Sequence, residues 1–207
     1  MRAVIDTCIV VDALQNREPF CRDAQAIFLL CANRQYEGFL TAKSVTDIYY
    51  LTHRQTHSEK TTRDVLKKLC TLFGLLDTRG LDIRKAISDE ISDFEDAVMI
   101  ETAIRSGMDC IVTRNIRDYK NAFIPVYTPE EFLELLARDQ VDKKLSLYKT
   151  DKSEYDKPYR NSISRPEASA FGSPAAVPGR DSGRSSGMIL HLDNYIRDTC
   201  IYVASYE

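Results

Sequence analysis

The sequence lacks several features that would each point to a particular class of protein. No apolar run approaches the roughly 18 residues that a membrane-spanning helix requires, and no long apolar segment of the signal-peptide kind follows Met1. We therefore expect a cytoplasmic chain with no membrane contact. The six cysteines form no Cys-x-x-Cys pair, so buried thiols are expected rather than a zinc or disulfide framework. The formal net charge of −3 provides no general basic surface, so a nucleic-acid contact would depend on a local patch.

What the chain does contain is a regular alternation of short apolar strands and helices over its first 137 residues. We expect strands at residues 2–5, 37–41, 74–77, 109–113 and 124–127. We expect helices at about 8–14, 19–34, 43–54, 59–73, 81–91 and 93–106, and a last helix from about 129. This alternation is typical of βαβ units, whose strands form a buried parallel sheet. The expected fold class is therefore α/β.

Local signals support several of these helix ends. Pro19 is suited to the first turn of its helix, where a missing N–H costs nothing. Gly107 follows an expected helix and is suited to the left-handed conformation that often closes one. Ser92 and Thr128 each precede a glutamate by three residues, which is the spacing of a capping box.

The composition changes in the last third of the chain. Half of residues 158–187 are Pro, Gly or Ser, and such a segment buries too little apolar surface to offset its ordering entropy. We therefore expect a globular domain at 1–137, a flexible low-complexity linker at 138–187 and a short apolar segment of unknown role at 188–207. That last segment either stays independent of the first domain or docks on it as an added strand or inhibitor.

Acidic and amide side chains are placed at the ends of the expected strands. Asp6 ends the first strand, Asn115 follows the fourth with Asp118 three residues later, and Asp47 and Asp96 lie early in helices. The carboxyl ends of parallel strands meet at one edge of a sheet, so these side chains can converge there. Several carboxylates in one place repel each other unless a divalent cation neutralises them, and oxygen ligands suit Mg²⁺ or Mn²⁺.

Four segments together resemble a known family. They are VIDTCIVVDAL (4–14), LTAKSVTDIYYLTHR (40–54), DFEDAVMIETAIRSG (93–107) and CIVTRNIRDY (110–119). Their order and spacing resemble those of PIN-domain proteins, a family of metal-dependent ribonucleases that includes the VapC-type toxins of toxin–antitoxin pairs. The resemblance covers about residues 1–137 and implies a PIN-like three-layer α/β/α fold with a central parallel sheet.

The resemblance also implies roles for individual residues. Asp6 matches the strand-end aspartate that binds metal in the family, and Asp96 matches the aspartate of the DFEDA segment. Asp47 stands where the family usually has a glutamate. Asn115 stands where many members carry a fourth acid, and Asp118 is the nearby carboxylate that can replace it. The implied metal ligands are thus Asp6, Asp47, Asp96 and Asp118, with Asn115 as a further candidate catalytic residue.

The implied activity is hydrolysis of single-stranded RNA with Mg²⁺ or Mn²⁺. One alternative is a catalytically weakened PIN domain that binds RNA or a protein partner. Cys8 favours that alternative, because the family commonly has Asn or Ser there and a thiol cannot supply the same hydrogen bonds to Asp6. The resemblance further implies a small antitoxin partner and a homodimer.

Other readings of the site residues are weaker or remain open. Receiver and haloacid-dehalogenase folds are disfavoured, since Cys8 and Thr41 stand where those folds need acids. His53 and His57 have helical spacing but lack the glutamate of a zinc protease. The better interpretation is a solvated helix face or a basic face for RNA, which would also include Arg54, Lys60, Arg63, Lys67 and Lys68. Asp93 and Glu95 are interpreted as a helix cap and a surface charge. Thr7 and Thr113 serve either a phosphate or a turn.

Overall fold

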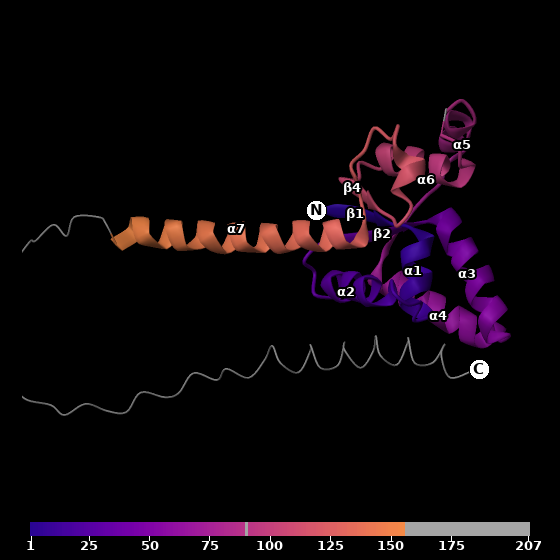
Figure 1. Ribbon diagram of the computed structural model, residues 1–207, viewed down its shortest axis with the longest axis horizontal. Coiled ribbons are helices and arrows are strands. Elements are labelled where there is room, and N and C mark those ends of the chain that lie inside the picture. Colours follow the sequence, from indigo (N-terminus) through magenta and orange to yellow (C-terminus); the bar gives the residue numbers. More distant parts are fainter. Residues whose placement is uncertain (90, 156–207) are drawn as a thin grey trace, which may run out of the picture.

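The computed structural model describes residues 1–89 and 91–155, with the side chains of residues 143–155 left undescribed. Five parallel strands form one sheet in the order β3-β2-β1-β4-β5 (Figure 1). The strands are β1 (Arg2–Ile5), β2 (Glu37–Thr41), β3 (Gly74–Leu76), β4 (Cys110–Val112) and β5 (Val126–Tyr127). The helices are α1 (Thr7–Leu14), α2 (Cys21–Ala32), α3 (Ala42–Thr56), α4 (Glu59–Leu72), α5 (Gly80–Ile87), α6 (Phe94–Arg105), the 3₁₀ helix η1 (Ile116–Tyr119) and α7 (Pro129–Tyr155).

Both faces of the sheet are covered, which explains why most of its strand positions are apolar on both faces. In β1, Ala3 and Ile5 pack into a core shared with α1, α2, α3, α4 and α7. Val4 points the other way, into a second core shared with α6 and the segment around Tyr119 and Ile124. Successive side chains of a strand point to opposite faces, so one short strand contributes to both cores. The expected three-layer α/β/α architecture with a central parallel sheet is confirmed.

Two of the expected helix ends are confirmed. Gly107 has a φ of +66° directly after the C-cap of α6, the conformation that glycine adopts without steric cost. At the start of α7, the Glu131 N–H donates to Thr128 Oγ1 at 3.1 Å, and Glu131 Oε2 accepts from the Thr128 N–H at 2.9 Å. The reciprocal bonds form the predicted capping box.

Two others are wrong. Ser92 does not cap α6; the interpretation of Asp93 as the cap is confirmed, because its Oδ1 accepts hydrogen bonds from the N–H groups of Glu95 and Asp96 at 2.8 and 3.3 Å. Helix α2 begins at Cys21 rather than at Pro19. The N–H groups of Phe20 and Cys21 both bond to the carbonyl of Arg17, which makes residues 17–20 a turn before the helix.

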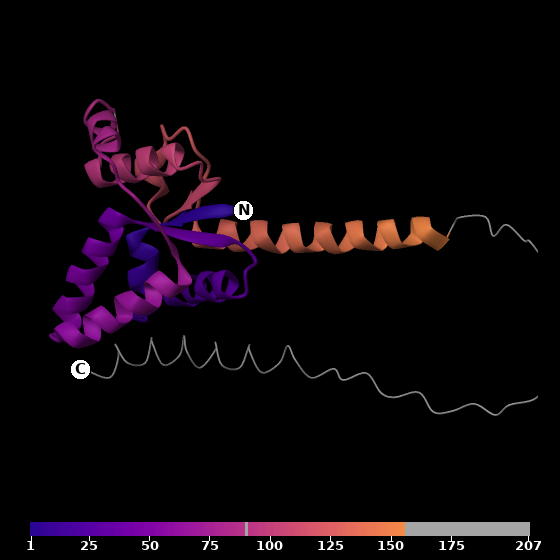
Figure 2. The ribbon, with the colours of Figure 1, turned by 180° about the vertical axis from the view of Figure 1, so that it is seen from behind.

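Helix α7 continues past residue 137, where the sequence predicted the end of the first domain. It reaches Tyr155 and projects away from the sheet in both views (Figure 1 and Figure 2). Its first turns belong to the core, because Phe132 and Leu136 are buried there. The rest of the predicted linker and the segment 188–207 lie outside the described residues, so those boundaries remain predictions.

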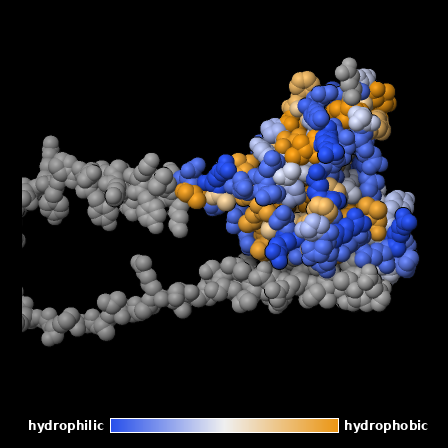
Figure 3. Space-filling view, in the orientation of Figure 1, coloured by the Kyte–Doolittle hydropathy of each residue, from blue (hydrophilic) through white to orange (hydrophobic). Residues whose placement is uncertain are grey.

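The outer helix α5 and the start of α6 expose several apolar side chains. These include Leu81, Ile87 and Phe94, and hydrophobic colour gathers over this region of the surface (Figure 3). The small cluster of Ala86, Ala97 and Val98 joins the two helices. Little apolar area is therefore available to hold α5 in place, and a polar contact supplements it, as discussed below.

The burial of the cysteines agrees only in part with expectation. Free thiols are found at Cys8, Cys21, Cys31, Cys70 and Cys110. Three of these are buried as expected, but Cys8 is half-buried and Cys70 is exposed. Cys200 lies outside the described residues.

Within residues 1–89 and 91–155, none of the helices has the length and apolar character needed to cross a bilayer.

Candidate active site

The site lies beyond the carboxyl ends of β1 and β4, which are neighbours in the sheet. The helices that follow these two strands pack on opposite faces of the sheet. A crevice opens beyond the carboxyl ends of such strands. Asp6 follows β1 directly, and the segment Thr113–Asn115 follows β4. Asp47 arrives from the second turn of α3 and Asp96 from the first turn of α6. Four separate elements thus deliver polar groups to one edge of the sheet.

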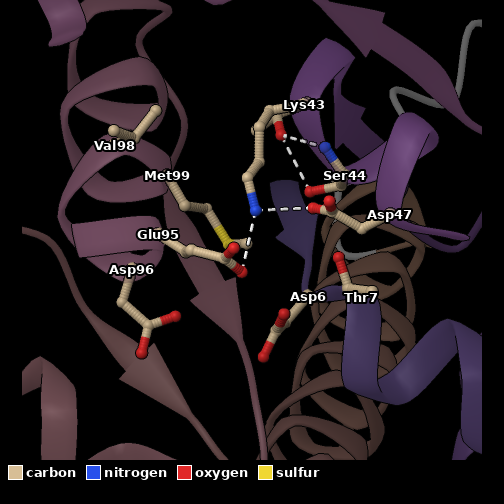
Figure 4. A pocket seen from close by; sticks show the side chains of 10 residues that line it. Asp6, Thr7, Lys43, Ser44, Asp47, Glu95, Asp96, Val98 and Met99 are labelled. Carbon is tan, nitrogen blue, oxygen red and sulfur yellow. Dashed lines mark hydrogen bonds and ion pairs between the residues drawn. The ribbon is translucent and has the colours of Figure 1, made fainter. Parts of the chain in front are cut away.

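The expected acids share two adjoining cavities. Asp6, Asp47 and Asp96 line a narrow cavity together with Lys43 and Glu95 (Figure 4). A wider cavity of about 350 Å³ also contains Asp6 and Asp96 in its wall. Its other lining residues are Cys8, Asp93, Glu95, Arg114 and Asn115. The structure therefore brings together four of the five predicted site residues, whereas Asp118 lines neither cavity.

Asp6 is fixed by two neutral donors. The carboxylate is 8% exposed, and its Oδ2 accepts from Thr113 Oγ1 at 2.7 Å and from Cys8 Sγ at 3.0 Å. The Thr113 hydroxyl also accepts from the N–H of Asn115 at 3.0 Å, so it links the ends of β1 and β4. The Cys8 thiol does donate to Asp6, as a weaker donor than the amide or hydroxyl expected at this position. Burial and the charge of Asp6 raise the pKa of Cys8 to about 12, so the sulfur keeps its proton.

Asp96 is the acid whose charge is least compensated. Its pKa is raised to about 6, chiefly by burial and further by the charges of Asp6, Asp93 and Asp118, against the opposing hydrogen bond from Tyr119. The Tyr119 hydroxyl donates to Asp96 Oδ1 at 2.6 Å. Its ring is buried against the second core, which fixes the orientation of the carboxylate. Burial is the main cause of the raised pKa, and the neighbouring acids add to it.

Asn115 and Asp118 are paired with each other. The Asn115 amide Nδ2 donates to Asp118 Oδ2, and Asn115 is the N-cap residue of η1. Asp118 acts on the site through its charge, which contributes to the raised pKa of Asp96. Of the two residues that the sequence left as alternatives, Asn115 therefore lines the wider cavity, whereas Asp118 lines neither cavity.

Lys43 is a site residue that the sequence analysis missed. Its ammonium Nζ lies 2.6 Å from Asp47 Oδ2 and 2.8 Å from Glu95 Oε2, between the two acids (Figure 4). Burial alone would lower the pKa of Lys43, but the two carboxylates outweigh it and the pKa lies above its ordinary value. Part of this contact was visible in the sequence, because residues four apart on a helix are neighbours. Glu95, expected to be a surface charge, is also part of the site.

Arg114 is the second missed residue. Its Nε lies 2.6 Å from Oδ2 of Asp12, a carboxylate on α1 that is fully buried. The guanidinium carbon lies 4.2 Å from the centre of the Phe20 ring, a cation–π contact. The side chain is 30% exposed and lines the wider cavity. The guanidinium is thus held from behind while part of it faces the carboxylates.

The donor chemistry of the site fits a hard divalent cation, because three aspartates from three elements line the same cavity and Asp96 is poorly neutralised. Among the described residues, however, no three His, Cys, Asp or Glu side chains lie close enough to hold an ion. Lys43 occupies the space between Asp47 and Glu95. The residues present therefore fit Mg²⁺ or Mn²⁺ in kind, with an ammonium already bound to one of the expected ligands.

The zinc interpretation of His53 and His57 gains no support in the part of the chain that the structure describes, where no such cluster exists. The His53 ring stacks on Tyr49, with ring centres 5.6 Å apart and planes 5° from parallel. The neighbouring Tyr50 is 70% exposed. The expected basic face on α4 is partly neutralised, since Arg63 and Lys67 pair with acids of the same helix.

Comparison with known proteins identifies the family. A model of the PIN domain matches residues 2–117, more than half of the chain. The chain belongs to the PIN-domain family, and the resemblance seen in the four sequence segments is confirmed.

Several solved structures are similar to the chain at low identity. VapBC2 from Rickettsia felis, bound to a DNA fragment from their promoter, is 14% identical over 62% of this chain and 98% of that chain, with a TM-score of 0.46. A toxin–antitoxin complex from Klebsiella pneumoniae is 22% identical over 61% and 97%, with a TM-score of 0.46. FitAcB from Neisseria gonorrhoeae is 18% identical over 61% and 97%, with a TM-score of 0.45. Comparison with curated proteins found no match.

Proposed function

We propose that this PIN-domain chain is a metal-dependent endoribonuclease that hydrolyses phosphodiester bonds of single-stranded RNA. The observation that carries the proposal is the convergence of Asp6, Asp47 and Asp96, from three separate elements, on one cavity at the carboxyl edge of the sheet. Within the described residues, neither Asp6 nor Asp96 forms an ion pair with a Lys or Arg, and the charges of neighbouring acids contribute to the raised pKa of Asp96. A divalent cation and a phosphate are the partners that such a site would bind together.

The candidate ligands for Mg²⁺ or Mn²⁺ are Asp6, Asp47, Asp96 and Asp118, with the Asn115 carbonyl oxygen as a neutral alternative. Such an ion supplies a bound water of lowered pKa and neutralises charge on the scissile phosphate. The chain orients the ligands: Thr113 and Cys8 hold Asp6, and Tyr119 holds Asp96. Each aspartate therefore presents its remaining oxygen in a fixed direction.

Arg114 is the candidate contact for the RNA backbone. A guanidinium offers several N–H donors that suit phosphate oxygens, and this one lines the same cavity as Asp6 and Asp96. Its pair with Asp12 and its stacking on Phe20 limit the rotamers that it must give up on binding. We assign it to gripping a phosphate beside the reacting bond.

The nucleophile of the proposed reaction is water. Cys8 is the most nucleophilic side-chain type in the lining, but its pKa of about 12 keeps it as a thiol. The acids serve as ligands rather than attacking groups, so no covalent intermediate with the protein is expected. Hydrolysis by water leaves one new hydroxyl and one phosphate monoester end.

The test uses the full chain and three end-labelled substrates of one sequence: single-stranded RNA, the same RNA in a duplex, and DNA. Each is incubated with Mg²⁺, with Mn²⁺ and with EDTA. We expect cleavage of single-stranded RNA that EDTA abolishes. Cleavage that persists in EDTA contradicts the proposal, as does a 2′,3′-cyclic phosphate product, since that product forms when the RNA's own 2′-hydroxyl attacks.

A second candidate is a PIN domain without catalysis that binds RNA or a protein. The observation that favours it is Lys43, whose ammonium already neutralises Asp47 and Glu95, together with the amide of Asn115 in place of an acid. Calorimetric titration with Mn²⁺ separates the candidates. Retained RNA affinity without any Mn²⁺ binding supports the second candidate and rules out the first.

The partners follow from the resemblance to VapC-type toxins. We extend to this chain a small antitoxin that holds it inactive, and a homodimer. Co-expression with the product of the neighbouring reading frame tests the first, with a stable complex and suppressed RNA cleavage as the expected result. Light scattering of the purified chain tests the second. The cytoplasmic location remains a prediction.

A further inference from the structure

Lys43 connects acids that belong to opposite layers of the fold. Asp47 is on α3, which packs into the first core, whereas Glu95 is on α6, which packs into the second. The ammonium contacts both, at 2.6 and 2.8 Å. The side chains of Lys43 and Asp47 are each 31% exposed, so the pair is partly withdrawn from water and its attraction is only partly screened. The Glu95 side chain is 69% exposed, so the less screened part of the contact is the pair of Lys43 with Asp47.

The other two aspartates of the cavity are held differently. Asp6 accepts from a hydroxyl and a thiol, and Asp96 accepts from a hydroxyl. In the described part of the chain, no ion pair with a Lys or Arg is formed by either. Of the three aspartates in the narrow cavity, only Asp47 is therefore bound by a cation from the protein itself.

We propose that Lys43 is a built-in competitor of the divalent cation for Asp47. The carboxylate of Asp47 coordinates the ion only when the ammonium of Lys43 has moved away from it. The inference rests on the metal site of the proposed function. A unit positive charge within the site repels a divalent ion and withholds one of its ligands, and both effects weaken metal binding. The sequence ties the competitor to its target, because Lys43 precedes Asp47 by one turn of α3.

The structure offers matched variants for a test. Lys43→Met and Lys43→Gln remove the charge and keep much of the side-chain length, while Lys43→Arg keeps the charge. Lys85→Met is the control, because Lys85 also pairs with a glutamate, Glu101, at 3.1 Å, outside both cavities. It changes the net charge of the protein by the same amount. Thermal melting checks that each variant is folded.

The measurement is the Mn²⁺ dissociation constant of the full chain by isothermal titration calorimetry. We expect about tenfold tighter binding in Lys43→Met and in Lys43→Gln, and wild-type binding in Lys43→Arg and Lys85→Met. Binding by the neutral variants alone, with none in wild type, also supports competition. Unchanged or weaker binding in the folded neutral variants overturns it, as does the absence of Mn²⁺ binding in all variants.

RNA cleavage assayed in parallel separates this inference from the proposed function. Tighter Mn²⁺ binding in Lys43→Met, without RNA cleavage by wild type or any variant, supports the competitor role of Lys43 and contradicts the proposed ribonuclease activity. Metal-dependent cleavage by wild type, with equal Mn²⁺ affinity in all variants, supports the ribonuclease activity and contradicts the competitor role of Lys43.

Discussion

At the scale of single residues, Asp96 links the electrostatics of the site to the stability of the chain. Its pKa in the folded chain is about 6, above the ordinary value of 3.8. The folded chain therefore holds this proton more tightly than the unfolded chain does. Stability falls as pH rises from about 4 to about 6, by roughly 1–2 kcal/mol for a half-buried group. The site thus destabilises the metal-free protein at neutral pH.

The corresponding prediction concerns Asp96→Asn in EDTA. The amide has no charge to desolvate, and its oxygen still accepts a hydrogen bond from Tyr119, so we expect a higher melting temperature than wild type at pH 7. The gain should shrink toward zero at pH 4, where wild-type Asp96 is protonated. Melting curves at both pH values measure this. A gain that is the same at pH 4 and pH 7 contradicts the assigned pKa.

A second residue-scale prediction concerns Arg114. Arg114→Lys keeps a cation for the buried Asp12 but loses the planar fork of donors, so we expect RNA to bind about tenfold more weakly while Mn²⁺ affinity stays unchanged. Fluorescence anisotropy with labelled RNA measures the first and calorimetry the second. Arg117→Lys, at an exposed position of η1 outside both cavities, is the control. Equal RNA affinity in both variants argues against the phosphate-gripping role.

At the scale of elements, α5 and α6 are joined by a buried ion pair. Asp82 is 1% exposed, and Arg105 contacts both of its oxygens, at 2.7 and 2.9 Å. Burial would raise the pKa of Asp82, but Arg105 and the N–H of Arg79 outweigh it and the pKa lies below its ordinary value. This pair supplements the small apolar cluster between the two helices. The pair joins the first turn of α5 to the last residue of α6, at the opposite end of α6 from Glu95 and Asp96.

We therefore predict that Arg105→Met destabilises the chain by about 3 kcal/mol, because it leaves a buried carboxylate without its partner. Urea unfolding measures the loss. The control is Arg138→Met, which removes an exposed pair with Glu134 and should cost less than about 0.5 kcal/mol. Equal losses in the two variants would show that the burial of Asp82 does not increase the contribution of its ion pair to the free energy of unfolding.

The elements themselves were largely predictable from the sequence, and the links between them were not. Apolar runs bounded by turn residues mark the strands, and a strand-end acid such as Asp6 is recognisable because it follows such a run. Lys43 with Glu95, and Arg114 with Asp12, join residues of different elements. Periodicity along a chain contains no information about which side chains of two packed elements meet. The sequence also left both Ser92 and Asp93 as candidate caps of α6, since both are suitable cap residues one position apart.

At the scale of the whole molecule, the described residues form a complete unit. The five-stranded sheet has helices on both faces, and the first core includes the start of α7 at Phe132 and Leu136. We predict that deleting residues 156–207 changes the melting temperature by less than about 2 °C, because both cores lie within the retained chain. Thermal melting and RNA cleavage of both forms test this. A large loss of stability, or a large gain in cleavage, would instead support docking of residues 188–207 on the first domain.

The central claim is that three aspartates from three elements form one metal-dependent ribonuclease site. The most direct measurement is the initial rate of single-stranded RNA cleavage in Mn²⁺ by wild type, Asp6→Asn, Asp96→Asn and the control Asp64→Asn, whose position on α4 is outside both cavities. The account predicts a loss of about a hundredfold in the first two variants and the wild-type rate in the control. Equal rates in all four proteins would contradict it.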